Sequence, residues 1–523
     1  MLRRALKRID QPAAAIAGLA AVALCGYVVV LPLWAAHTPM MTDVPFHTAT
    51  AAGIRHYFDP EWHFQEQFAL RLVGVPYLSF YGLIAALMTV FSPLVATRIA
   101  IALMLALLPA GFATLAWGMR KSPLLGLFAL LLVWGVLTHW GFVNHMAALG
   151  MFAAAVGFAL RLTQQPSRGL AWALGLTLGL ILFTHIYRFP FAWAASLGAG
   201  LFMWPDRQKL KPLLWPLAIP LILFLVWLII RPSSIGINLR LVWPEFARFT
   251  EFDVHVYDAL LGQDDLTLYG KAALLLGAAA GGLTVRAVVR RLRNEHEPSD
   301  FALRSHLLVA GCAVVVLFIY LTFPVWIGSW FFVFPRAGTT LVFLLFALVP
   351  DLPRHGLARL GFVAIVAISL VPIARHVAEA HVEFAETTDD MWTLSAELPK
   401  APKLAYLIVD HSGSRNHVSP YLHLPAYVQA THGGWLSWHF ALLGASPLAY
   451  RDPDEKGTVI PPDPPADWLW HPDEFKIDAH GAFFDWFLVR SQKSPAWRFR
   501  KDPSIIPAGH EGKWWLFKRE SNP

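Results

Sequence analysis

Long apolar runs constrain the fold of this chain more than any other feature. Runs of about 18 residues or more recur before residue 380, and each can cross a bilayer core of about 30 Å. Of the 523 residues, 56% are hydrophobic and only 15% are charged, whereas a soluble domain carries about 25% charged residues. The predicted fold class is an all-α polytopic membrane bundle. Eleven spans are expected, at residues 12–35, 95–118, 122–139, 143–161, 169–186, 189–204, 213–231, 267–289, 303–322, 331–350 and 357–374.

Basic residues decide whether a twelfth apolar run, 72–92, also crosses. If it does not cross, the basic amino terminus and every basic loop lie on one face, as the positive-inside rule requires. The run 72–92 is therefore predicted to be a juxtamembrane or re-entrant segment packed against protein. The amino terminus is then cytoplasmic and the carboxyl terminus extracytoplasmic. The residues placed inside are Arg120, Lys121, Arg161, Arg168, Arg207, Lys209, Lys211, Arg286, Arg290, Arg291, Arg293, Arg304, Arg354 and Arg359.

The same distribution excludes other function classes. The net charge of +7 comes from short loops between spans, which is a topology signal and does not indicate nucleic-acid binding. Cys25 and Cys312 lie inside apolar runs, so neither a disulfide framework nor a thiolate metal cluster is expected. The basic start, residues 1–8, could open a signal peptide. The apolar run that follows is longer than the usual 7–15 residues, so a retained first span is expected.

The composition changes after residue 380, where apolar spans stop and Pro, Asp, His and Trp become frequent. Residues 404–409, 483–490 and 513–518 are predicted strands, and the Pro-rich stretch 459–465 is a predicted loop. The expected organisation is a transmembrane domain over residues 1–380, with a first outer loop at 36–71, and a small extracytoplasmic α/β domain over residues 381–523.

Asp43 is the leading candidate for chemistry. It follows the first span closely, in an outer loop rich in His and aromatic residues. A buried carboxylate can take a proton from an attacking hydroxyl. His47 is four residues on and shares a face with Asp43 if the segment is helical. It could orient the carboxylate, bind a phosphate when protonated, or help to hold a divalent cation. A solvated loop aspartate and a packing histidine are the alternatives.

Further polar residues gather on the predicted outer face. An arginine near the membrane is costly unless paired, and its planar fork suits phosphate oxygens. Each one could instead be a snorkelling arginine, and lone histidines in membrane turns are often interfacial hydrogen-bonding groups. The candidate substrate-binding residues are Arg55, His56, His139, His145, His185, Tyr187, Arg188 and Arg336.

Histidines are also dense in the predicted outer domain, at His411, His417, His423, His432 and His439. Their spacing matches no compact metal site, so they are predicted to lie at the surface or in a groove. The tryptophans near 435–438 and 468–470 could stack on a sugar ring or pack the domain. No zinc-binding HExxH motif, phosphate-binding P-loop or GxSxG nucleophile elbow stands in a suitable context.

This layout resembles the GT-C fold of membrane glycosyltransferases, including relatives of the protein mannosyltransferases and the aminoarabinose transferase. Asp43 matches the acid of their first outer loop, 72–92 looks like their juxtamembrane segment, and the run with Arg98 looks like their next span. The stretches 483–490 and 513–518 are similar to the tail of many bacterial members. Many relatives carry an acidic pair in the first loop, but here Val44 and Pro45 follow Asp43.

The resemblance implies an inverting glycosyltransferase in a bacterial inner (plasma) membrane. It would move a sugar from a polyprenyl-phosphate donor to a glycan, lipid or protein acceptor of the cell envelope. Asp43 would be the base, His47 would position it, and Arg188 and Arg336 would hold the donor phosphate. The metal ligands are unknown. A divalent cation would need a second acid from Glu61, Glu66 or loop 232–266. The alternative is a non-catalytic scaffold or a transporter of envelope polysaccharide assembly, but the polar residues gather at one face and no halves repeat, which disfavours transport.

Overall fold

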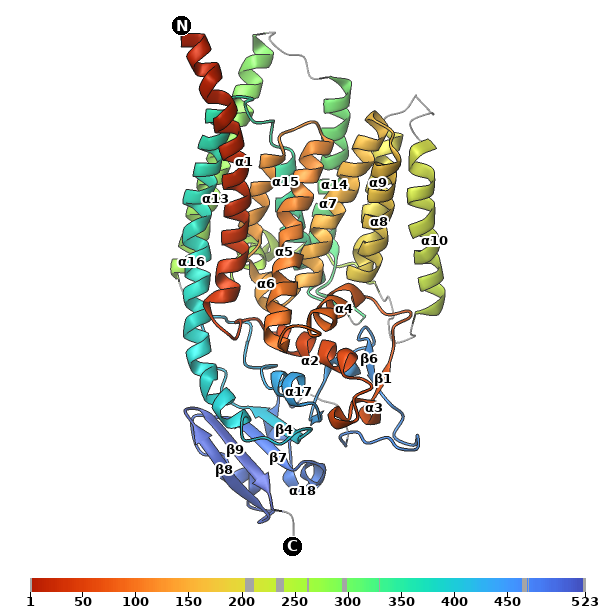
Figure 1. Ribbon diagram of the computed structural model, residues 1–523, viewed down its shortest axis with the longest axis vertical. Helices are drawn as coiled ribbons and strands as arrows, with labels where there is room; N and C mark the ends of the chain where they lie inside the picture. Colours follow the sequence, from red (N-terminus) through yellow and green to blue (C-terminus); the bar gives the residue numbers. More distant parts are fainter. Residues whose placement is uncertain are drawn as a thin grey trace. The chain divides into compact units, whose positions relative to one another are not determined.

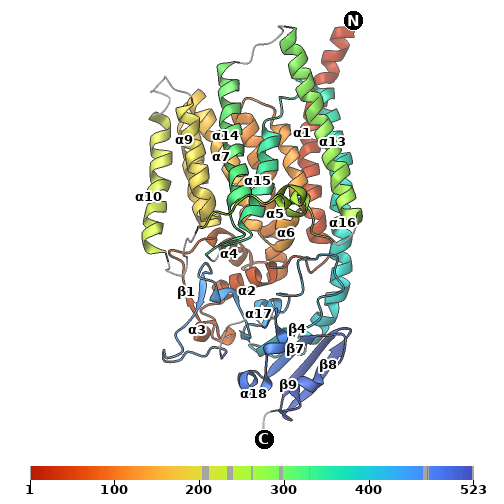
Figure 2. The same cartoon turned by 180° about the vertical axis from the view of Figure 1, so that it is seen from behind.

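The structure is a computed structural model that describes residues 2–202, 211–231, 239–260, 263–293, 299–328, 330–462, 468 and 470–520. The predicted inside residues Arg207 and Lys209, and part of the Pro-rich stretch 459–465, lie outside these ranges. The chain divides into two compact units. Unit 1 comprises residues 1–32, 102–138 and 142–377, and unit 2 comprises residues 33–101, 139–141 and 378–523. Figures 1 and 2 show the helices and strands of both units.

Unit 1 is helical because its sequence offers long runs of Leu, Ala, Val and Phe with few breakers. Helix α1 (Leu2–Ala35) and helix α5 (Pro93–Gly118) begin in one unit and end in the other. Helix α16 (Gly356–Ser395) likewise begins in unit 1 and ends in unit 2. The remaining long helices are α7 (Val143–Gln164), α8 (Arg168–Thr184), α9 (Phe189–Leu201), α10 (Leu214–Ile230), α13 (Gln263–Leu292), α14 (Asp300–Thr322) and α15 (Val333–Ala347). Short helices α11 (Ala247–Thr250) and α12 (Phe252–Val256) and the two-stranded pair β2 (Trp326–Ile327) and β3 (Trp330–Phe331) complete it.

Seven helices of the described chain are long and apolar enough to cross a membrane. They cover Asp10–Ala35, Pro93–Gly118, Val143–Gln164, Lys211–Ile230, Asp264–Leu292, Asp300–Thr322 and Gly356–Ser395. The predicted spans 169–186 and 331–350 correspond to the shorter apolar helices α8 and α15. The predicted span 189–204 corresponds to α9, whose 13 residues stop at Leu201.

One predicted span is not a continuous α-helix. Residues 122–139 form a 3₁₀ helix over Pro123–Leu132, followed by the short helix α6 (Val136–Trp140). Two glycines in this stretch approach neighbouring backbone: a Cβ on Gly126 would lie 2.6 Å from the carbonyl oxygen of Pro109, and one on Gly135 would overlap the carbonyl oxygen of Val256. The predicted span 122–139 is therefore a buried run that begins as a 3₁₀ helix.

Glycines also allow α5 and α7 to pack closely. A Cβ on Gly111 or Gly118 would overlap the backbone of Gly150 or Gly157 on the facing helix. Within each helix the two glycines are seven residues apart, which is two helical turns, so they lie on one face of that helix. Small residues let membrane helices approach and gain van der Waals contact.

Unit 2 contains helix α2 (Val44–Arg55), helix α3 (Phe64–Gln67), helix α4 (Leu78–Leu87) and helix α17 (Ala426–His432). Strand β1 (Phe68–Leu70) pairs antiparallel with β6 (Leu448–Tyr450), which joins the first outer loop to the C-terminal region. Helix α4 is the helical part of the run 72–92. Its ten residues measure about 15 Å, half of what a crossing helix needs.

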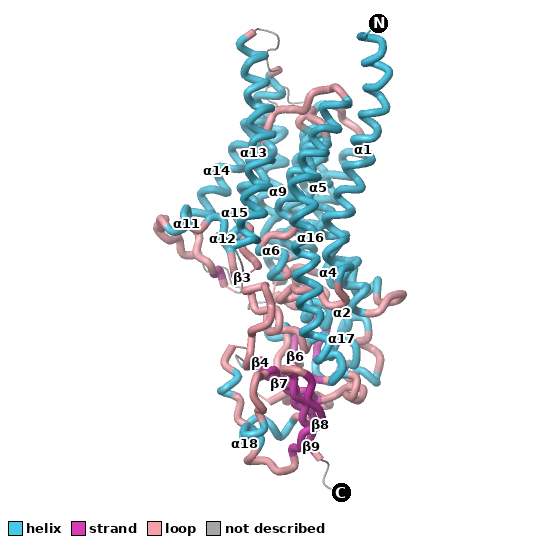
Figure 3. The backbone as a smooth tube through the Cα atoms, turned by 90° about the vertical axis from the view of Figure 1, so that its left-hand side faces the viewer, coloured by secondary structure: helices cyan, strands magenta, loops and turns pink. Residues whose placement is uncertain are grey.

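The C-terminal region of unit 2 holds a five-stranded sheet in the order β5-β4-β7-β9-β8, drawn in magenta in Figure 3. Strands β5 (Trp435–Leu436), β4 (Lys403–Ile408) and β7 (Trp486–Arg490) are parallel to one another. Strand β9 (Trp514–Arg519) runs antiparallel to both of its neighbours, β7 and β8 (Ile505–Glu511). Helix α18 (Ile477–His480) comes shortly before β7 in the sequence. The predicted strands 404–409, 483–490 and 513–518 are confirmed as β4, β7 and β9. One face buries Leu407, Phe487, Val489 and Phe517 around Phe484.

Candidate active site

Asp43 stands immediately before helix α2, in unit 2. The helix begins at Val44 with Pro45 in its first turn, where a proline costs no hydrogen bond. Asp43 occupies the N-cap position, but its side chain makes no capping hydrogen bond. The carboxylate is therefore directed to other groups than the helix end.

The backbone of this segment is held by residues 139–141. The N–H groups of Thr42 and Asp43 donate to the carbonyls of His139 and Trp140, each at 3.0 Å. Gly141 follows with φ +98°, and a Cβ there would lie 2.9 Å from the Cβ of Asp43. Only glycine adopts that backbone region at low cost. His139 thus contributes its main chain to the site, while its ring is fully buried beside His381.

Two histidines lie beside the Asp43 carboxylate. Nδ1 of His423 is 3.2 Å from Oδ1 of Asp43, and the side chains are 8% and 16% exposed. His47 lies one turn along α2, and its Nδ1 is 3.0 Å from the Tyr81 hydroxyl. Burial lowers the pKa of His47 to about 4, although the charge of Asp43 opposes the shift. At neutral pH His47 is uncharged, so phosphate binding by a protonated His47 is disfavoured. Its hydrogen bond goes to Tyr81, and orientation of the carboxylate by His47 stays a prediction.

An aromatic wall surrounds these groups. Phe46 contacts the rings of His423 and Trp438, each at 4.9 Å, and stacks on Phe440 at 4.7 Å. The ring of Trp438 stacks on His423 with an interplanar angle of 14°. Aromatic faces of this kind bind the apolar faces of sugar rings as well as one another.

A second polar cluster lies in unit 1, at one end of a cavity of about 440 Å³. Its polar lining consists of His145, His185, Tyr187, Arg188, Trp330, Arg336 and Thr340. The rest of its lining is almost wholly apolar, mostly from α9 and from residues 308–323 in and after α14, with Phe152 of α7 and Val333 and Ala337 of α15. Helices α9 and α14 are drawn side by side in Figure 2. The lining on α14, from Leu308 to Ile319, extends over about 17 Å at 1.5 Å per residue.

The two arginines of the cavity are held by neutral partners. Arg188 donates to Nε2 of His145 and to Oγ1 of Thr340, both at 3.0 Å. Arg336 donates to Nε2 of His185 at 3.3 Å, and its guanidinium lies 4.0 Å from the centre of the Phe142 ring. Each histidine accepts from a cation and is therefore in a neutral tautomer. Among the described residues that line this cavity, none is Asp or Glu.

Helix ends add to the positive potential of the same cluster. His145 is in the first turn of α7, Arg188 is the N-cap of α9, and Arg336 is in the first turn of α15. A helix N-terminus carries roughly half a positive charge and unpaired N–H groups. Tyr187 and Trp330 stack at 4.5 Å beside these ends. The cavity thus combines a cationic end with an apolar channel, and it suits an amphiphile with an anionic head.

The other predicted substrate-binding residues lie elsewhere. Arg55 is exposed and His56 follows it at the far end of α2, about 18 Å of helix from Asp43. His56 is 2.6 Å from Asp59 and stacks on Trp62 at 3.8 Å, an arrangement that stabilises the turn after α2. The structure does not bring these two residues to Asp43, and their role in substrate binding stays a prediction.

The arrangement of His, Cys, Asp and Glu in the described residues gives no support for metal binding. Among the described residues, no group of three or more His, Cys, Asp or Glu could hold a metal ion. Glu66 is 2.6 Å from His63, Glu61 is exposed, and Asp265 is 3.6 Å from His376. The possible divalent cation stays untested.

His423 is the residue that the sequence did not single out. It and His439 were expected at a surface or in a groove with the other C-terminal histidines, but both are buried. A signal was present: His423 interrupts the apolar run from Tyr421 to Ala430, so burial could have been predicted. Its partner Asp43 could not.

Comparison with known proteins supports the fold. No family model and no curated protein sequence matches the chain. The structure is similar to that of ArnT from Cupriavidus metallidurans bound to undecaprenyl phosphate, with a TM-score of 0.51 and 13% identity over 95% of this chain and 97% of that chain. It is also similar to the arabinofuranosyltransferase AftD from Mycobacteria, with a TM-score of 0.47 and 13% identity over 97% of this chain and 40% of that chain. The similarity to ArnT confirms the expected GT-C fold.

Proposed function

We propose that this chain is an integral membrane glycosyltransferase that takes a sugar from a polyprenyl-phosphate donor. The observation that carries the proposal is the cavity of unit 1, whose arginine cluster opens into an apolar channel. A polyprenyl phosphate has the matching chemistry, an anionic head on a long hydrocarbon tail. ArnT, which has the same fold, was solved with undecaprenyl phosphate.

The arginines act on the leaving group in this proposal. Arg188 and Arg336 bind the phosphate oxygens through charge-assisted hydrogen bonds, each worth about 1.5–3 kcal/mol. Negative charge develops on the phosphate as the bond from the anomeric carbon to its oxygen breaks, so the guanidiniums stabilise the transition state more than the ground state. The stacked pair Tyr187 and Trp330 shields this end from water.

Asp43 serves as the general base. Its carboxylate takes the proton of the acceptor hydroxyl while that oxygen attacks the anomeric carbon, and the polyprenyl phosphate leaves with the bonding electron pair. A single displacement of this kind inverts the anomeric configuration. The half-buried position of Asp43 beside an uncharged His47 keeps competing water and cations few. The acceptor is a glycan, lipid or protein on the outer face of the bacterial inner membrane.

The test does not need the acceptor. Protein in lipid nanodiscs is titrated with undecaprenyl phosphate, and binding is compared for wild type, the double variant Arg188→Gln/Arg336→Gln and the control Arg161→Gln. Arg161 is in the last turn of α7, over the ring of Trp117, and it does not line the cavity. The proposal predicts a loss of at least 100-fold in the double variant and less than twofold in the control. Equal affinity in all three proteins would point to a scaffold or transporter.

A further inference from the structure

The imidazole of His423, from the C-terminal region, lies against the carboxylate of Asp43. Only 6% of the residue is exposed. Its Nδ1 is buried and makes no hydrogen bond in the described structure, although it is 3.2 Å from Oδ1 of Asp43. A buried polar atom left unsatisfied costs about 1–3 kcal/mol. The position of this nitrogen is explained if Asp43 is its partner.

Aromatic residues pack against the ring of His423 on three sides and fix its plane. Trp438 stacks on it at 5.6 Å and an interplanar angle of 14°. Phe46 contacts it edge-on at 4.9 Å, and Phe440 contacts it edge-on at 5.3 Å. Within this plane Nδ1 lies on the side of the Asp43 carboxylate.

The segment that carries His423, residues 410–423, is tied to the residues just before Asp43. Oγ1 of Thr42 donates to the carbonyl of Val418 at 2.6 Å. The amide nitrogen of Asn416 donates to the carbonyl of Met40 at 3.2 Å, while its oxygen accepts from the N–H of Val418 at 3.0 Å. These hydrogen bonds therefore fix the backbone next to Asp43 relative to the segment that carries His423.

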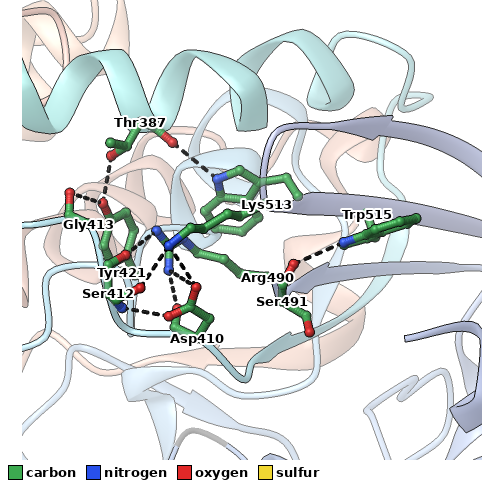
Figure 4. Close-up of polar contacts among 10 residues, drawn as sticks. Thr387, Asp410, Ser412, Gly413, Tyr421, Arg490, Ser491, Lys513 and Trp515 are labelled. Carbon is green, nitrogen blue, oxygen red and sulfur yellow. Dashed lines mark hydrogen bonds and ion pairs between the residues drawn. The ribbon is translucent and has the colours of Figure 1, made fainter. Parts of the chain in front are cut away.

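The other side of the same segment is fixed by Arg490 on β7 (Figure 4). Its buried guanidinium donates to the carbonyls of Asp410 and Ser412, the latter at 2.6 Å, and lies 3.5 Å from the centre of the Tyr421 ring. Tyr421 in turn donates to the carbonyl of Gly413 at 2.8 Å. Lys513 on β9 donates to Ser412 at 2.7 Å. The sheet of the C-terminal region thus fixes the approach of His423.

From this geometry we propose that His423 is a positioning residue for the base of the transferase: Nδ1–H donates to Oδ1 of Asp43 and leaves Oδ2 to receive the acceptor proton. The inference rests on the proposed function. It assigns the C-terminal region a part in the chemistry. The titratable groups around the carboxylate are His423, His47 and, through His47, Tyr81.

Two substitutions separate the effect of the Nδ1 donor from the effect of ring packing. His423→Phe keeps an aromatic ring between Trp438 and Phe46 but removes the donor. His423→Asn keeps an N–H close to the position of Nδ1 but removes the ring. His439 supplies the matched control, because it is a fully buried histidine that also contacts Phe46, at 5.5 Å, while its Nδ1 accepts from the N–H of Ala441.

The assay uses full-length protein in proteoliposomes made with the lipid extract of its host membranes. Initial rates of label transfer from radiolabelled undecaprenyl-phosphate sugars are measured at varied donor concentration. His423→Phe is expected to lower kcat at least tenfold with KM within twofold, because the donor is bound by other residues and only the positioning of the base is lost. His423→Asn is expected within threefold of wild type, and His423→Phe should add no loss to Asp43→Asn.

The outcomes are distinguishable. If wild type transfers sugar and His423→Phe matches it in kcat and KM, the positioning role is wrong while the proposed function stands. Equal losses in both His423 variants, or the same pattern in the two corresponding His439 variants, would mean a packing role and would also overturn the inference. A wild type inactive with every donor, beside unchanged undecaprenyl phosphate binding in the arginine variants, would overturn both proposals.

Discussion

Removal of Arg188 should separate ligand affinity from stability. In Arg188→Met, the cavity loses one of its two cations and keeps most of the aliphatic volume. Two hydrogen bonds from the guanidinium to neutral partners, His145 and Thr340, are lost, at about 1.5–3 kcal/mol each. Against this, the protein no longer desolvates a guanidinium, which costs several kcal/mol before compensation, and no longer holds two like charges in one cavity.

These terms nearly cancel for the ligand-free protein, so its Tm should change by less than about 3 °C. The bound state behaves differently because the phosphate loses a charge-assisted hydrogen bond worth about 1.5–3 kcal/mol, which corresponds to roughly 10- to 150-fold in Kd. The loss should shrink at high salt, since screening weakens the attraction between Arg188 and the phosphate in wild type.

Undecaprenyl phosphate titration and thermal unfolding, both in nanodiscs, measure the two quantities on one sample. Arg161→Met is the control, and its affinity should stay within twofold of wild type. The reasoning would be refuted if Arg188→Met bound the lipid phosphate as tightly as wild type. It would also be refuted if the variant unfolded more than about 5 °C earlier, because Arg188 would then be a structural residue.

Further predictions concern unit 2. Gly141→Ala should lower activity and reduce the free energy of unfolding by about 1–2 kcal/mol, because φ is +98° and the new Cβ meets Asp43. The control is Gly179→Ala, whose methyl group meets open space. Thermal unfolding should show this control to be as stable as wild type or more stable. At Asp410, burial raises the pKa, but hydrogen bonds from Ser412 and Lys513 outweigh it and lower the pKa to about 2. This stability is present above about pH 4 and is lost as pH falls toward 2. Asp410→Asn should therefore lose about 2 kcal/mol at pH 7 and a smaller amount at pH 2, and equal losses at both pH values in denaturant titrations would contradict the assignment.

The helical fold was largely predictable, because a crossing helix must be long and apolar and hydropathy alone reveals that. Strands β4, β7 and β9 were predictable from short runs of apolar and aromatic residues. Strand β8 was not, because Pro507 and Gly509 interrupt it; it lies at the sheet edge, where proline is tolerated, and its register shifts between those two residues. The 3₁₀ helix at Pro123–Leu132 depends on close backbone packing, which no local pattern encodes.

The candidate site also contains residues that could be predicted from the sequence and one that could not. The cavity residues His185, Tyr187 and Arg188 could be proposed together because they are adjacent in sequence at the end of a predicted span. Arg336 joined them through the predicted topology, which placed it on the same face. The contact of His423 with Asp43 spans 380 positions, and nothing in either local sequence names the other. Spacing within one helix predicted His47 instead, whose hydrogen bond goes to Tyr81.

The most direct test of the account is sugar transfer by wild type and by Asp43→Asn, measured side by side. Membranes containing each protein are supplied with radiolabelled polyprenyl-phosphate sugars, and label is followed into the glycan, lipid and protein fractions. The account predicts transfer by wild type and a loss of at least 1,000-fold in the variant, on the order of the contribution of a general base together with its positioning, with lipid-phosphate binding and Tm unchanged. Full activity in Asp43→Asn would contradict it.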